Sequence, residues 1–243
     1  MWFDALAIVV SIAAGAIAAV TGFGIGSLLT PLLALQVDTR LAVAAVSIPH
    51  VVGTALRFWH LRTEVDRRVF WNFGLTSAAG GLVGALLYDL ASNRWLTIVF
   101  GILLLFAAAS EVTGLARRMR FHGSVAWIAG AASGVLGGLV GNQGGIRSAA
   151  LLGFDLPKAA FVATATAVGL LVDGARMPVY LLTQHAELGA MWRSIALATV
   201  GVTAGTVLGT RALHWIPDSS FRRVLALILA LLGGAMLIKG LRS

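Results

Sequence analysis

Three arginines lie inside long apolar stretches of the sequence, beyond the first few residues of each stretch: Arg57, Arg147 and Arg176. An arginine at the centre of a membrane-spanning helix costs at least about 2.5 kcal/mol on insertion scales, so it persists there where it has a partner or a function. The guanidinium group carries a permanent positive charge and several N–H donors. The three residues therefore predict a binding site for a small anion inside a membrane.

Two of these arginines also fit structural interpretations. Arg57 lies near the end of its stretch. Its side chain therefore either binds the substrate or extends along the helix to the membrane interface. Arg176 lies one helical turn from Asp173, the spacing of an ion pair. Asp173 is the acid clearly inside a spanning stretch, and it either pairs permanently with Arg176 or carries a coupling proton. His50, beside Pro49, either relays protons or bonds a carbonyl freed by the proline kink.

Glycine-rich segments supply a second kind of anion site. The sequences Gly22-Phe-Gly-Ile-Gly26 and Gly141-Asn-Gln-Gly-Gly145 interrupt apolar stretches. A half-helix starting at Ser27 or Ile146 would point unpaired amides and the positive end of its dipole at the membrane centre. Backbone amides and two side-chain amides are the expected ligands there, carried by Gly22, Gly24, Gly26, Asn142, Gln143, Gly144 and Gly145. Tight helix packing is the alternative role, and we favour it for Gly15, Gly134, Gly137 and Gly138.

The elements that position these residues are duplicated. Residues 15–59 align without a gap on residues 134–178 at a shift of 119 positions, which pairs Arg57 with Arg176 and Gly22 with Gly141. Thr54 occupies the position of Asp173, so the arginine is common to both repeats and the acid belongs to one. Repeated glycine breaks and charges inside hydrophobic segments are typical of the substrate path of a transporter.

Eight apolar stretches account for most of the chain. They run from 5 to 35, 41 to 59, 69 to 87, 95 to 112, 125 to 154, 159 to 182, 191 to 208 and 224 to 238. Six have roughly the length of one spanning helix, about 20 residues. The first holds 31 residues, which as one straight helix would reach about 46 Å, against a hydrocarbon core of about 30 Å. We expect the first and fifth stretches to break at their glycines, and the freed backbone to be buried in protein or to line a wet cavity.

Two topologies follow from these breaks. If each broken stretch is a kinked crossing, the repeats are parallel and nine Lys and Arg lie inside against six outside. If each is a re-entrant hairpin, the repeats are inverted and the division is ten against five. Positively charged loops stay on the cytoplasmic side, so we favour the inverted arrangement, with both glycine tips near the midplane. The basic segment Arg117-Arg-Met-Arg120 separates a first repeat, residues 1–118, from a second, residues 119–243.

Composition fixes the broad class. The chain is 58% hydrophobic and 12% charged, with a mean hydropathy of +0.91, which indicates an all-α integral membrane protein. The formal charge of +8 lies in short clusters between apolar runs, as in topology-determining loops, so we expect no nucleic-acid partner. No cysteine is present. Motifs for hydrolases, zinc proteases and nucleotide binding are absent, so we expect no enzyme, cofactor or metal, although Ser47 near His50 leaves an intramembrane enzyme as a remote alternative.

The glycine-rich segments also carry a family resemblance. AGAIAAVTGFGIGSLLTPLLAL in the first repeat and SGVLGGLVGNQGGIRSAALLGFDLPKAAFVATA in the second resemble the TauE/SafE family of sulfite exporters, also called the toluene sulfonate uptake permease family. The resemblance implies a multi-pass transporter of the bacterial inner membrane for small sulfur-containing or carboxylated anions, with a site between the repeats. Proton coupling is an open alternative under this resemblance, as are an anion channel in place of a carrier and a homodimer. The first glycine segment lacks the Asn-Gln pair of the second, which argues against a symmetric site.

Overall fold

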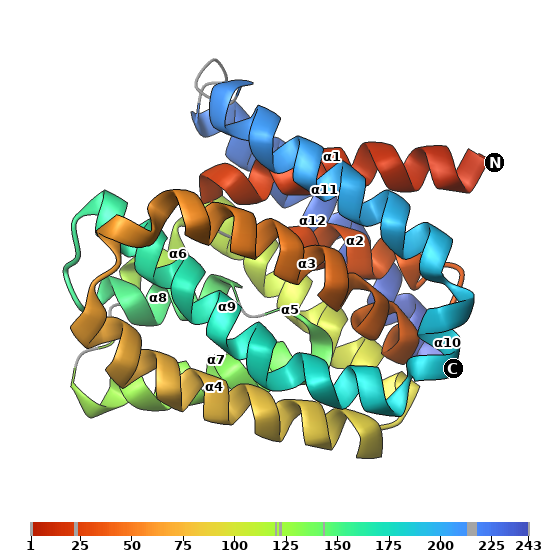
Figure 1. Ribbon diagram of the computed structural model, residues 1–243, viewed down its shortest axis with the longest axis horizontal. Coiled ribbons are helices and arrows are strands. Elements are labelled where there is room, and N and C mark those ends of the chain that lie inside the picture. Colours follow the sequence, from red (N-terminus) through yellow and green to blue (C-terminus); the bar gives the residue numbers. More distant parts are fainter. Residues whose placement is uncertain are drawn as a thin grey trace.

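The computed structural model describes residues 2–21, 24–119, 121, 123–142, 144–212 and 218–242, and these residues form helices and connecting turns without a strand (Figure 1). The helices are α1 (Trp2–Thr21), α2 (Ile25–Leu33), α3 (Thr39–Leu61), the 3₁₀ turn η1 (Arg62–Glu64), α4 (Arg67–Leu90), α5 (Asn93–Thr113), α6 (Leu115–Arg118), α7 (Ser124–Val140), α8 (Gly144–Leu152), α9 (Lys158–Thr183), α10 (His185–Ala190), α11 (Trp192–Ala212) and α12 (Asp218–Arg242). The predicted all-α class is confirmed.

The two over-long apolar stretches break where the glycines predict. Each becomes a long arm followed by a nine-residue helix: α1 precedes α2, and α7 precedes α8. Gly24 at the start of α2 has φ 133° and Gly141 at the end of α7 has φ 70°, a region that glycine enters without steric cost. The short helices begin at Ile25 and Gly144, two residues before the predicted starts at Ser27 and Ile146.

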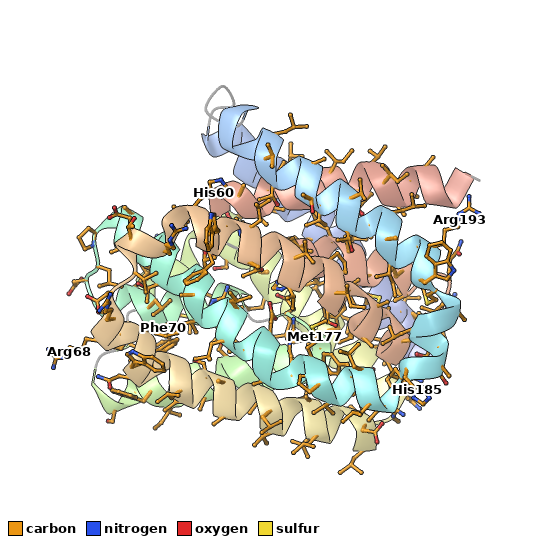
Figure 2. All side chains as sticks on the ribbon, viewed as in Figure 1. His60, Arg68, Phe70, Met177, His185 and Arg193 are labelled. Carbon is orange, nitrogen blue, oxygen red and sulfur yellow. The ribbon has the colours of Figure 1, made fainter. Side chains whose placement is uncertain are left out.

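Five helical segments are long and apolar enough to cross a membrane within the residues described: Thr39–Glu64, Arg67–Leu90, Asn93–Thr113, Ala159–Thr183 and Arg223–Arg242. The remaining stretch predicted to span, residues 191–208, lies in α11, which has 21 residues but is not among these five. Large apolar side chains such as Leu90, Val112 and Leu182 are exposed on the outer surface. Charged side chains instead mark the two ends of the long axis, with Arg68 at one end and Arg193 at the other (Figure 2). The chain is therefore a multi-pass membrane protein.

Helices α4 and α7 cross at very short range. A methyl group added at Gly80 would lie 2.2 Å from the carbonyl oxygen of Ala131, and one at Gly84 would lie 2.1 Å from that of Val135. Gly134 on α7 packs equally closely against a carbonyl oxygen of α4. Small residues at such crossings allow two backbones to approach within membranes, where no hydrophobic force drives helices together.

Helices α1 and α11 repeat this crossing with matched residues. A methyl group at Gly205 would lie 2.0 Å from the carbonyl oxygen of Ile12, and one at Gly209 would lie 2.7 Å from that of Ala16. Gly15 packs against a carbonyl oxygen of α11, as Gly134 does against α4. The packing role assigned to Gly15 and Gly134 from the sequence is confirmed. The long arm of each repeat thus packs on a helix of the other repeat.

The two broken segments each begin and end at one end of the molecule. Phe121, just before α7, lies against Gly153, just after α8. The end of α2 lies beside the last turn of α12, where Lys239 donates hydrogen bonds to the carbonyls of Ala34 and Val37. The start of α1 and the end of α12 share one end of the long axis, whereas α6 and α8 lie toward the other (Figure 1).

Helices α3 and α9 run antiparallel through the centre. The backbone N–H of Asp66, just after α3, donates to Thr164 near the start of α9 at 2.9 Å. Midway along both helices, His50 contacts Asp173. This antiparallel pair passes both glycine breaks and carries four of the candidate site residues, which are His50, Arg57, Asp173 and Arg176.

Candidate functional site

The second glycine break lies against the first turn of α2. The carbonyl oxygen of Gly141 occupies the space beside Gly26, where an added methyl group would lie 2.5 Å from it. Ser27 donates a hydrogen bond of 3.3 Å to the side-chain oxygen of Asn142. These contacts join segments 115 positions apart in the sequence and bring the start of one short helix to the break that precedes the other.

Asp173 is the centre of a buried polar cluster. Its side chain is fully buried, and one carboxylate oxygen accepts a hydrogen bond from Arg176 Nε at 3.0 Å and forms an ion pair with Arg176 Nη2 at 2.7 Å. The other oxygen lies 2.7 Å from His50 Nδ1. The ion pair expected between Asp173 and Arg176 is present. Within the described part of the chain, the Nδ1 of His50 contacts Asp173, at 2.7 Å, and Thr54, at 3.5 Å, and not a freed carbonyl.

Arg57 and Arg176, which the repeat pairs, donate hydrogen bonds to equivalent backbone carbonyls. Arg57 Nη1 donates to the carbonyl of Ala18 in the last turn of α1, and Arg176 Nη1 donates to the carbonyl of Gly137 in the last turn of α7. Ala18 and Gly137 are themselves related by the shift of 119 positions. A cation beside the carbonyl end of a helix is favoured by the helix dipole and satisfies an orphan acceptor. Each arginine therefore fixes the end of an arm directly before its glycine break.

Arg147 differs from the other two arginines. It is 4% exposed, and its Nε and Nη1 have no hydrogen-bond partner among the residues that the structure describes. Its Nη1 lies over Gly169 on α9, where an added methyl group would be 2.8 Å away. It is close enough to interact electrostatically with Asp173, Arg176 and Arg57. Buried N–H donors cost free energy when they are unpaired, so this guanidinium is suited to receive an anion.

The charges in this cluster do not cancel. Arg57, Arg147 and Arg176 contribute three positive charges and Asp173 contributes one negative charge, so an excess of two positive charges is buried when His50 is neutral. Each uncompensated charge is expensive in a low-dielectric interior. A bound oxyanion would relieve this cost by supplying both charge and acceptors. The arrangement is suited to binding an anion, since it combines excess positive charge with the unpartnered Nε and Nη1 of Arg147.

The comparisons with known proteins agree with this chemistry. A family model described as "Sulfite exporter TauE/SafE" matches residues 7–236. The chain belongs to the TauE/SafE family. No curated protein and no solved structure matched. Because the match covers nearly the whole chain, both glycine breaks and all three buried arginines lie within the TauE/SafE region.

The other predicted site residues of this TauE/SafE chain lie at or beside the breaks. Gly24 precedes α2, and Gly144 and Gly145 form the first turn of α8. Gly22 and Gln143, also predicted as ligands, lie outside the described residues. Ser47, which the enzyme alternative requires as a nucleophile, donates its hydroxyl to the carbonyl of Ala44 in its own helix.

Two tyrosines join the cluster without having been predicted. The Tyr180 hydroxyl donates to the carbonyl of Gly138, next to the carbonyl that Arg176 holds. Its ring packs on that of Tyr88, with centroids 4.7 Å apart. These are the two tyrosines of the chain. The available signal was their placement, since Tyr180 lies inside the apolar stretch 159–182 and Tyr88 lies one residue past the stretch 69–87, and a buried phenol requires a hydrogen-bond partner.

Proposed function

We propose that the chain is a secondary transporter of small sulfur oxyanions or related organic anions in the bacterial inner membrane, working by alternating access. The observation that carries this proposal is Arg147, a buried guanidinium with two unpartnered nitrogens in the described structure, beside two further arginines. The family description, sulfite exporter, supplies the class of substrate. The anion would lie between Arg147 and the start of α8, whose first amides point toward the break.

We further propose that the two repeats are inverted and that α1–α2 and α7–α8 are re-entrant. Support comes from the antiparallel course of α3 and α9 and from the close approach of Phe121 to Gly153. Inverted repeats with half-helices near the midplane are a common transporter architecture, in which one bundle moves against another around a fixed site.

Proton coupling belongs to the same proposal. His50 and Asp173 are in direct contact, and Asp173 also holds Arg176. A proton taken up by this pair would weaken the hold of Asp173 on Arg176, which in turn holds the end of α7. Uptake of the proton would thereby alter the contact that holds the end of α7, the helix before the second glycine break. Both residues were chosen as coupling candidates from the sequence, and their contact supports choosing them together.

The test is uptake of sulfite, thiosulfate, sulfoacetate and acetate into proteoliposomes, with and without a pH gradient. We expect saturable uptake of a sulfur oxyanion. Arg147→Gln removes a charged hydrogen-bond donor worth about 1.5–3 kcal/mol, so the half-saturation concentration should rise about 10- to 150-fold. Arg68→Gln is the matched control, because Arg68 is exposed at the end of the molecule.

Three results would count against the proposal. Unchanged uptake by Arg147→Gln would remove this residue from the site. Flux that never saturates and ignores an opposing gradient would favour a channel. If no anion is transported, the assignment of substrate class fails, and the buried arginines are then structural.

A further inference from the structure

A groove separate from the arginine cluster lies between α3, α4 and α9. Its inner part is a cavity of about 410 Å³ with an entirely apolar lining: Phe58, Phe70, Ala78, Ala167, Leu170, Leu171, Gly174 and Ala175. Leu171 and Gly174 lie on a different face of α9 from Asp173 and Arg176, which are turned toward the core. The groove therefore opens toward the surroundings of the helix bundle and not into the anion site.

The groove has one polar end. A second cavity of about 700 Å³ adjoins the first and shares Phe58, Phe70 and Ala167 with it. Its lining adds Arg62 and Arg67 and includes no carboxylate. Both arginines are exposed, and Arg67 is the neighbour of Arg68 in the first turn of α4. Arg68 projects at one end of the molecule, and Phe70 lies close to this end (Figure 2). The groove thus runs from a positively charged mouth at the end of the bundle to an apolar interior along α9.

Trp59 and Trp71 flank the mouth. Trp71 lines the second cavity, and the Arg62 guanidinium lies 3.9 Å from the centroid of the Trp59 ring. Arg62 Nη1 also donates to the carbonyl of Trp59 at 2.9 Å, which holds the side chain in place. Tryptophan and arginine at such positions are typical of the level of the lipid headgroups.

The inner cavity is elongated along one helix. Its lining residues Ala167 and Ala175 are eight residues apart on α9, a rise of about 12 Å at 1.5 Å per residue. The apolar part of the groove therefore follows the direction in which a membrane-spanning helix, and a lipid acyl chain beside it, cross a bilayer.

We propose that this groove binds one anionic phospholipid, with its phosphate at Arg62 and Arg67 and an acyl chain along α9. Charge complementarity selects the headgroup, because two arginines and no carboxylate line the mouth. The order of the groove, polar at the end of the bundle and apolar toward its middle, matches the order of a lipid in a bilayer. The site is independent of the proposed transport activity, since it shares no residue with the arginine cluster.

The experiment titrates the detergent-purified protein with phosphatidylglycerol that carries a brominated acyl chain, and follows quenching of tryptophan fluorescence. Trp71 lines the groove, so occupancy should quench it, and Trp71→Phe should remove that part of the signal. Arg62→Ala combined with Arg67→Ala should weaken binding about 30-fold, at about fivefold for each arginine. Arg68→Ala, which changes an arginine on the same helix that does not line the groove, should leave binding unchanged.

A second variant tests the acyl-chain part independently. Gly174 lines the groove and has open space where a Cβ would lie, so the side chain of Gly174→Leu should occupy the groove and abolish saturable quenching. Equal quenching by brominated phosphatidylcholine, with no effect of the arginine substitutions, would mean bulk lipid contact and overturn the proposal. Displacement of the lipid by inorganic phosphate alone would also overturn it, because the mouth would then be a site for free anions.

Discussion

Asp173→Asn tests whether the central carboxylate is the ionised partner of Arg176. The substitution keeps the size of the side chain and one carbonyl oxygen, so both contacts with Arg176, the ion-pair contact at 2.7 Å and the hydrogen bond at 3.0 Å, remain geometrically available. The amide nitrogen replaces the oxygen that lies 2.7 Å from His50 Nδ1 and becomes a donor to it. What changes is the negative charge opposite a fully buried guanidinium.

The loss of stability can be estimated from these contacts. A hydrogen bond to a charged acceptor contributes about 1.5–3 kcal/mol, against about 0.5–1.5 kcal/mol for a neutral one. If the hydrogen bond from Nε and the ion-pair contact of Nη2 are each weakened by about 1–1.5 kcal/mol, the free energy of unfolding falls by about 2–3 kcal/mol. Asp173→Ala removes the partner altogether and should cost about 3–5 kcal/mol, as for other broken buried pairs.

The assay is unfolding of the purified protein on titration from a mild detergent into sodium dodecyl sulfate, followed by circular dichroism. Asp89→Asn is the control, because Asp89 is exposed at the end of α4, and it should change stability by less than about 0.5 kcal/mol. Asp173→Asn combined with Arg176→Gln should lose less than the sum of the single losses, by about 0.5–3 kcal/mol. Strict additivity, or a single variant as stable as the unaltered protein, would refute the ionised pair.

Two further predictions concern the framework. Gly205→Ala places a methyl group 2.0 Å from the carbonyl oxygen of Ile12, so α1 and α11 must separate by about 1.4 Å to reach the ordinary contact of 3.4 Å; thermal unfolding should show a loss of about 1–3 kcal/mol, whereas Gly234→Ala, with open space, should be nearly neutral. Arg57→Gln shortens the side chain that holds the carbonyl of Ala18 and should cost about 1–3 kcal/mol in the same assay. A neutral outcome would contradict its role at the end of α1.

The sequence was sufficient for features that recur within it. The breaks at Gly24 and Gly141 follow from chain length against membrane thickness, and the structure confirms both. The pairing of Arg57 with Arg176 followed from the internal repeat, and the two residues do hold equivalent carbonyls. Each of these features occurs in both repeats, so the sequence contains two independent examples of it.

Contacts between distant segments could not be predicted in this way. His50 and Asp173 are 123 positions apart, and no periodicity within either helix indicates that they meet. The repeat itself was a poor guide for Arg147, because the equivalent position holds Leu28 and the residue has no duplicate. Of the two roles left open for His50, the structure shows a contact between its Nδ1 and the carboxylate of Asp173, which tertiary packing supplies and which local sequence could not indicate.

The packing of α1 on α11 and of α7 on α4 determines the order in which these helix contacts form during synthesis of the chain. The face of α1 around Ile12 packs on Gly205, 193 positions later in the chain, whereas α7 packs on α4, which is already made. At a synthesis rate of about 5–20 residues per second, α1 leaves the ribosome about 10–40 s before its partner exists. During that interval its small-residue face must be covered by lipid or by the insertion machinery. Helix α7 of the second repeat therefore packs on α4 of the first repeat as soon as α7 is made. The contact of α1 with α11 forms later, when most of the second repeat has been synthesised.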